Sequence, residues 1–179
     1  MLVLSALWAI YRKKDLKKIG EAQIKGLLLF AIAFLLQFLF HGLILIAVNA
    51  QVTQWLRWIY PWVHMFSYQL ILIGILLDIE KSYMKVFFLG AMMNFIVILA
   101  NGMKMPVYLP IDHVNYASSY AYLATGNDLV HTLMTESTRI KWLGDIIMSR
   151  SRYPIEKSIS IGDIFLVIGF GWFIQEESR

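Results

Sequence analysis

Long stretches without a charged side chain are the feature that most constrains what this chain can fold into. The clearest extends from Gly26 to Val48, and as a helix it is long enough to cross a hydrocarbon core of about 30 Å. Similar windows cover 58–77 and 86–103, and a fourth, 158–175, contains Asp163 near its start. Hydrophobic residues make up 59% of the chain and charged residues 16%, whereas soluble domains carry about 25% charge. These values predict a membrane protein and exclude a disordered chain.

We expect an all-α fold: an integral membrane helical bundle of four to five spans with an extracytoplasmic helical loop cap. The whole chain, 1–179, would form a single membrane domain. As a helix, residues 1–11 would cover only about 17 Å, so whether they form a fifth span stays open. The expected segments are a short N-terminal apolar segment (1–11), a cytoplasmic basic segment (12–25), spans at about 26–48, 59–78, 85–101 and 160–175, and an external loop cap (102–157).

The expected orientation follows from the basic residues, because short cytoplasmic loops of membrane proteins are enriched in Lys and Arg. Six of them lie between the first two apolar segments: Arg12, Lys13, Lys14, Lys17, Lys18 and Lys25. We therefore expect 12–25 and the C-terminus in the cytoplasm, with the N-terminus and 102–157 outside the cell membrane. The net charge of +4 has the same explanation, so no nucleic-acid partner is expected. An aromatic belt at the outer interface would consist of Trp55, Trp58, Tyr60 and Trp62.

The long polar segment before the last span is expected to fold, since aromatic and aliphatic residues are scattered through it. Two short helices fit its turn residues. Residues 113–125 would form one, with Asp112 as its N-cap and Gly126 at its end. Asp128 would cap another that reaches about Thr138. A folded lid and a re-entrant element that lines a cavity both fit this pattern.

A candidate polar binding site lies in this segment. His131, Thr135 and Thr138 follow one another at spacings of four and three, so they would share one face of the second helix. Together with Arg139, they could hold a phosphate or a carboxylate, although a water-facing amphipathic helix explains the same pattern. Asp145 has no evident capping role, and a pair between Arg139 and Asp145 would stabilise a partly dry cap.

Asn101 completes the candidate site at the end of the third span. Either Gly102 adopts a left-handed conformation that closes the helix, or the Asn101 amide faces a cavity. Within the first long span, Gln37 and His41 lie four residues apart on one face. His41 is the intramembrane candidate, because ionisable groups at membrane depth are usually functional.

Two further patterns limit the chemistry. Asp163 follows Ser160 by three residues, which is the spacing of a helix capping box. No His-Glu-x-x-His or similar metal-binding spacing occurs, and no known catalytic motif is present. We therefore expect no metal and no cofactor, and whether the protein is an enzyme stays open.

Three short motifs follow one another along the chain: Asn-Gly-x-x-Met-Pro at 101–106, Thr-Arg-x5-Asp at 138–145 and Ser-x-Gly-Asp at 160–163. In sequence and spacing they resemble one prokaryotic family of multi-pass membrane proteins that is known only as a domain of unknown function. The resemblance extends over essentially the whole chain. It implies a multi-pass membrane fold and implies no activity.

Three classes of function stay open. The small size and the lack of a catalytic motif favour a non-catalytic accessory or interaction subunit, with a membrane-protein partner or a homo-oligomer in the lipid bilayer. A small carrier or channel would need a water-filled cavity lined by His41 and Asn101. A membrane enzyme or binding protein acting on a lipid head group or lipid-linked phosphate would need His131, Arg139 and Asp145 to converge on one cleft.

Overall fold

The computed structural model describes residues 16–110, 116–126, 128–149 and 157–178. The possible fifth span (1–11) and the expected cap residue Asp112 lie outside these ranges. The described part is mostly helical, which confirms the all-α prediction. Its helices are η1 (Leu16–Glu21), α2 (Leu27–Ile46), α3 (Ala50–Leu76), α4 (Ser82–Ala100), α5 (Tyr116–Ala124), η2 (Lys141–Leu143) and α6 (Ile161–Glu177).

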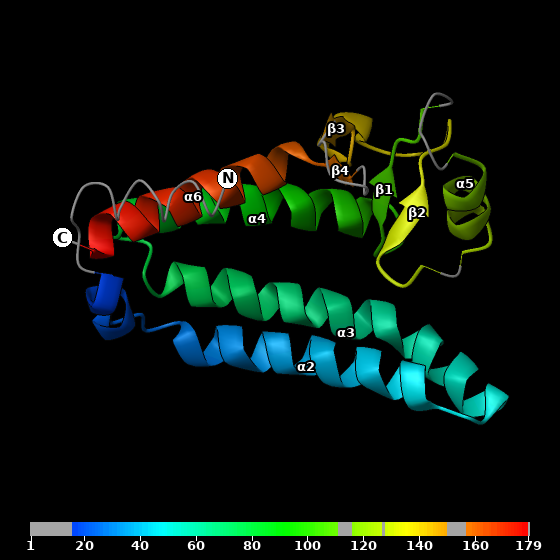
Figure 1. The fold of residues 1–179 in the computed structure, drawn as a ribbon, viewed down its shortest axis with the longest axis horizontal. Helices are drawn as coiled ribbons and strands as arrows, with labels where there is room; N and C mark the ends of the chain where they lie inside the picture. Colours follow the sequence, from blue (N-terminus) through cyan, green and yellow to red (C-terminus); the bar gives the residue numbers. More distant parts are fainter. Residues whose placement is uncertain (1–15, 111–115, 127, 150–156, 179) are drawn as a thin grey trace.

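The long helices form two antiparallel pairs (Figure 1). α2 packs along α3, α4 packs along α6, and contacts between α3 and α4 join the pairs. Among the described helices, α2, α3 and α4 are long and apolar enough to cross a membrane. α6 has 17 residues and lies beside α4. The architecture is thus that of a helical membrane protein, as the charge-free windows predicted.

α3 is longer than the expected span at its N-terminal end. Its first residue is Ala50, whereas the span was expected from about 59, and the helix includes the charged Arg57. The cause is Asn49, whose side-chain oxygen accepts hydrogen bonds from the backbone N–H groups of Gln51 (2.8 Å) and Val52 (3.3 Å). Such an N-cap starts a helix outside the apolar window that crosses the membrane.

Glycines allow the two helices of each pair to approach closely. A Cβ atom built on Gly26 would lie 2.2 Å from the carbonyl oxygen of Gly74, at the α2–α3 contact. A Cβ atom on Gly90 would lie 2.6 Å from the carbonyl oxygen of Gly162, at the α4–α6 contact. Contacts of this kind are typical of helices that pack within membranes, where small residues let the backbones meet.

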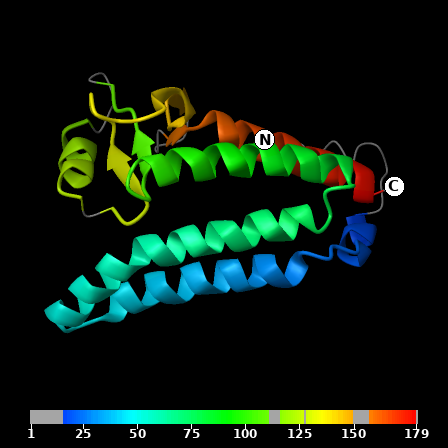
Figure 2. The ribbon, with the colours of Figure 1, turned by 180° about the vertical axis from the view of Figure 1, so that it is seen from behind.

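The long segment between α4 and α6 forms a cap on the end of α4 (Figure 2). It contains α5 and two small sheets. The strands are β1 (Met105–Val107) parallel to β2 (His131–Leu133), and β3 (Ile147–Ser149) antiparallel to β4 (Lys157–Ile159). Figures 1 and 2 place this cap on the same side of the bundle as the turn between α2 and α3.

Of the two helices expected in the cap, one is present. α5 covers the first, and the chain leaves it through Gly126, whose φ is +68°. The second, expected from Asp128 to Thr138, is wrong. The Asp128 carboxylate accepts hydrogen bonds from the N–H groups of Val130 (2.8 Å) and His131 (2.7 Å), and this turn leads into β2 instead.

The cap extends down beside the α2–α3 hairpin. Leu129 and Val130 pack against Ile44, Leu56 and Tyr60 of that hairpin. Since Ile44 lies two residues before the end of α2, the cap reaches the depth of the last turn of a helix that can cross the membrane. The polar groups of the cap therefore lie against protein as well as against water.

Candidate functional site

The cap brings one histidine and two carboxylates together. His131 Nε2 lies 4.0 Å from Asp145 Oδ2, and His131 Nδ1 lies 3.2 Å from Asp128 Oδ1. β1 holds this arrangement. His131 is in β2, paired with β1, and Asp145 bridges to Val107 of β1, with the Asp145 N–H donating to the carbonyl of Pro106 (2.9 Å).

Burial distinguishes Asp145 from the other acidic residues of the cap. Its exposed fraction is 6%, and its Oδ1 atom has no hydrogen-bond partner within the described residues. Burial, together with the charge of Asp163, raises the pKa of Asp145 to about 6. The hydrogen bond to Asp128 raises the pKa of His131 above its ordinary 6.5. Although burial opposes it, hydrogen bonding lowers the pKa of Asp128 to about 2.

These pKa shifts predict a protein that is less stable at alkaline pH. Asp145 binds its proton more tightly when folded, so its contribution to stability is greatest below its ordinary pKa of 3.8 and is lost as the pH rises through about 6. The contribution of protonated His131 is present below pH 6.5 and is lost as the pH rises through its raised pKa. Together, Asp145 and His131 should lower the Tm in detergent as the pH rises from about 4 to above 6.5.

Asp145→Asn tests this assignment. Removing the buried charge should raise the stability at pH 8 by about 1–2 kcal/mol, once partial solvent screening is allowed for. That corresponds to a Tm increase of about 2–8 °C and a flatter pH profile. Glu136→Gln is the matched control, because the Glu136 side chain is fully exposed and should leave the profile unchanged. An unchanged profile between about pH 4 and pH 6 in Asp145→Asn would show that Asp145 is not the group that titrates in this range.

The other candidate residues of the cap do not converge on this pair. Arg139 and Thr135 are exposed, and the expected pair between Arg139 and Asp145 is not formed. The reason is the missing helix: residues 135–138 form a turn in which the Thr138 N–H donates to the carbonyl of Thr135 (3.2 Å). Asp145 instead has His131 as its charged neighbour.

Asn101 has a structural role. Its Nδ2 donates to the carbonyls of Val97 (2.8 Å) and Arg139 (2.9 Å), and its Oδ1 accepts from the Arg139 N–H (2.8 Å). Gly102 has a φ of +70°, which confirms the left-handed helix end. The amide thus joins the end of α4 to the cap rather than facing a cavity.

Sequence reasoning missed part of the polar cluster below the cap. The capping box of Ser160 and Asp163 is confirmed at the start of α6. Asn94 of α4 extends it, since its Nδ2 donates to Asp163 Oδ1 (2.8 Å) and its Oδ1 accepts from the Ser160 hydroxyl (2.9 Å). The signal in the sequence that could have identified this contact was Asn94 itself, a polar residue in the middle of an apolar span.

The two intramembrane candidates, Gln37 and His41, both contact Tyr60 of α3 but in different ways. The Gln37 amide bonds to His64 Nδ1 (2.6 Å) and accepts from the Tyr60 hydroxyl (2.9 Å), so it lies between α2 and α3. His41 is exposed, and its ring meets Tyr60 edge-on with centroids 6.5 Å apart. Of the two side chains, Gln37 is the one that forms hydrogen bonds to the neighbouring helix, which is the usual role of an intramembrane amide.

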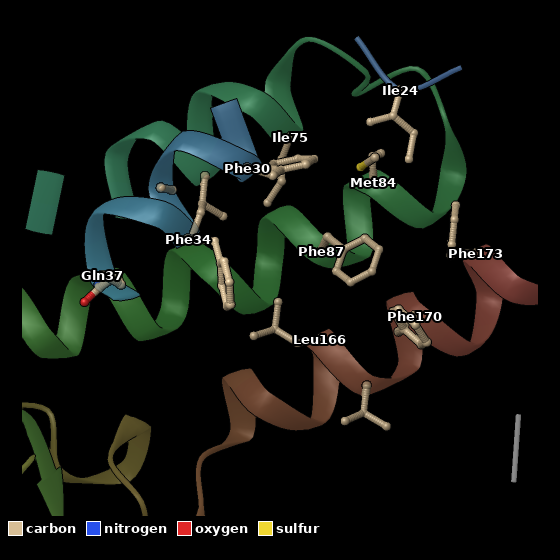
Figure 3. Close-up of a pocket in the computed structure, with 13 residues that line it drawn as sticks. Ile24, Phe30, Phe34, Gln37, Ile75, Met84, Phe87, Leu166, Phe170 and Phe173 are labelled. Atoms are coloured by element: carbon tan, nitrogen blue, oxygen red, sulfur yellow. The ribbon is translucent and has the colours of Figure 1, made fainter. Parts of the chain in front are cut away.

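An apolar groove of about 600 Å³ lies between α2 and α6 (Figure 3). Phe30 and Phe34 line it from α2, and Leu166 and Phe170 line it from α6. Gln37, at one end, is its single polar lining side chain among the described residues. The groove therefore suits hydrocarbon and offers no second set of reactive groups.

The outward face of α3 carries an exposed stripe. We call its seven residues the α3 stripe: Trp55, Trp58, Trp62, Phe66, Gln69, Ile73 and Leu76. Six of them are apolar or aromatic, as expected for a surface that faces lipid. Gln69 is the exception, and its amide forms no hydrogen bond within the part of the chain that the structure describes.

In the described ranges, no group of three or more His, Asp or Glu side chains is placed to hold a metal ion.

Comparison with known proteins gives a family and no activity. No curated protein and no solved structure matches the chain. The model of a family of unknown function, DUF5317, matches residues 21–175. Because this match covers most of the 179 residues, the chain belongs to the DUF5317 family.

Proposed function

We propose that the chain is a non-catalytic subunit of a membrane complex, and that it contacts another protein through the middle of the α3 stripe. The observation that carries this proposal is the exposed amide of Gln69 in a helix that can cross the membrane. In this proposal α6 is the fourth span of a protein of the cell membrane, and the cap lies outside.

The depth of Gln69 makes its exposure significant. The helical rise from Trp58, in the expected outer belt, to Gln69 is about 16 Å. The rise from Gln69 to Asp78 is about 14 Å. Together these lengths match a hydrocarbon core of about 30 Å. Gln69 therefore lies near the middle of the bilayer, at the greatest distance from water.

An amide in that position needs a partner. Transfer of an amide from water to a hydrocarbon without a hydrogen bond costs about 4–8 kcal/mol. Lipid tails offer no donor or acceptor, whereas a neighbouring protein helix can offer both. A protein contact at Gln69 is therefore the arrangement of lowest free energy.

Site-specific photo-crosslinking in native membranes tests the proposal. A photoreactive amino acid at position 66, beside Gln69 on the α3 stripe, leaves the amide in place and should give a protein adduct. Leu35 is the matched control: it is exposed on α2, and it lies two residues from Gln37 just as Phe66 lies two residues from His64, the hydrogen-bond partner of Gln37. Position 35 should give lipid adducts only. Lipid adducts alone at both positions would contradict the proposal.

The proposed orientation has its own test. The chain contains no cysteine, so single cysteines can be introduced cleanly at positions 17 and 120. A membrane-impermeant thiol reagent should label Tyr120→Cys in intact cells and should label Lys17→Cys only after the membrane is opened. The opposite pattern would place the cap in the cytoplasm.

A second candidate function is favoured by the pair of His131 and Asp145. A buried carboxylate oxygen without a partner, beside a histidine at the outer end of the bundle, suits a binding protein, a carrier or channel, or an enzyme acting on a lipid head group or lipid-linked phosphate. Asp145→Asn would then lose a bound small molecule in native mass spectrometry, while the control Glu136→Gln retained it. Retention of all bound species with an altered Tm would assign the pair a structural role.

A further inference from the structure

We propose that the partner at Gln69 is a second copy of this chain, bound through the α3 stripe in a two-fold symmetric dimer. This inference rests on the proposed protein contact at Gln69 and names its partner. The symmetry axis runs along the membrane normal, so that the two α3 helices lie side by side and in the same direction.

Symmetry brings the two Gln69 residues together. Two copies inserted with the same orientation place every residue at the same depth as its counterpart. An isologous contact about an axis along the membrane normal therefore sets residue 69 against residue 69. A second copy therefore brings a polar group to the depth of Gln69.

The chemistry of the amide fits self-pairing. A glutamine side chain carries an NH2 group with two donors and a carbonyl oxygen that accepts. Across a two-fold axis, Nε2 of each Gln69 can donate to Oε1 of the other, so each amide gains one acceptor and one donor in a single contact. Interhelical hydrogen bonds of this type are a known means of association between membrane helices.

The spacing of the α3 stripe also fits a helix–helix contact. Its seven residues are separated by three or four positions throughout, which places them on one face of α3. Phe66, Ile73 and Leu76 are 52%, 49% and 48% exposed, so each has surface available to pack against a partner. From Trp62 to Leu76 the spacings alternate between four and three, which is the seam used by pairs of parallel helices.

Disulfide crosslinking in membranes tests the dimer. Because the chain has no cysteine, Phe66→Cys and Ile73→Cys can join only two copies that meet at the α3 stripe. Mild oxidation should give covalent dimers from at least one of them, since their Cα atoms must come within about 7 Å. Ile32→Cys, on α2, should stay monomeric.

The role of Gln69 is tested separately. Gln69→Leu should weaken dimerisation about 5- to 30-fold, measured by energy transfer between labelled copies diluted in lipid vesicles. Gln69→Asn, which keeps an amide, should restore part of the affinity. Since Gln69 is exposed in the single chain, both variants should fold with the wild-type Tm when all three proteins are diluted to monomers.

The outcomes separate this inference from the proposed function. Disulfide-linked dimers at the α3 stripe, together with weaker dimerisation of Gln69→Leu, support the two-fold dimer. A photo-adduct at position 66 with a different protein, without disulfide dimers, overturns the dimer and leaves the interaction subunit in place. Dimers whose yield Gln69→Leu leaves unchanged overturn the pairing of the amides. Lipid adducts alone at position 66, with no disulfide dimer, overturn both.

Discussion

Gly90→Ala is expected to destabilise the protein by about 3 kcal/mol or more, the largest effect that we predict for a single methyl group. The added Cβ would lie 2.6 Å from the carbonyl oxygen of Gly162 and 3.0 Å from the backbone nitrogen of Leu166. Both are backbone atoms of α6, so relief requires the helix pair to separate. We expect the Tm in detergent to fall by about 6–12 °C.

Gly42→Ala is the control for this prediction. Gly42 lies within α2, and a Cβ at this position meets no atom within 4 Å. Alanine is the better helix former, so this variant should be as stable as the wild type or up to about 1 kcal/mol more stable. Equal melting of both variants with the wild type would show that α4 and α6 do not approach as described.

Asn101→Ala is expected to release the cap from the bundle. The variant loses two hydrogen bonds to the backbone of Arg139 and one to Val97, at about 1 kcal/mol each. We expect a loss of about 2–3 kcal/mol and faster proteolysis of the cap. Limited proteolysis of right-side-out vesicles, followed by mass spectrometry of the fragments, measures this directly.

Asn101→Asp separates the contributions of these hydrogen bonds. Aspartate keeps an acceptor for the Arg139 N–H and loses the two donors, so its cap should be cleaved at an intermediate rate. Cleavage of both variants at the wild-type rate would show that other contacts hold the cap. Cleavage of the Asp variant at the rate of the Ala variant would show that the donors matter most.

The membrane helices were the predictable part of the fold. Absence of charge over about 20 residues is enough to indicate a span, because the bilayer excludes charged side chains. The early start of α3 was less evident, since it depends on the capping geometry of Asn49. The short strands of the cap were not predictable, because β1 pairs with β2 only after the chain has travelled from Met105 to His131.

The candidate site, too, could be predicted from the sequence only in part. His131 and Asp145 were identified by residue type, and the structure brings them within 4.0 Å. Arg139 was assigned to the same site because a helix was expected, and the turn at Asp128 removes that geometry. The exposure of Gln69 cannot be derived from its neighbours, since a membrane helix is apolar on its lipid-facing and its protein-facing sides alike.

Native mass spectrometry of the full chain, released from membranes in mild detergent, tests the central claim most directly. If the chain is an interaction subunit, it should leave the membrane in a protein complex of fixed stoichiometry that survives the removal of bound lipid. Gln69→Leu should shift the population towards the monomer. A wild-type chain that is monomeric at every detergent concentration, with lipids as its only bound species, would contradict the account.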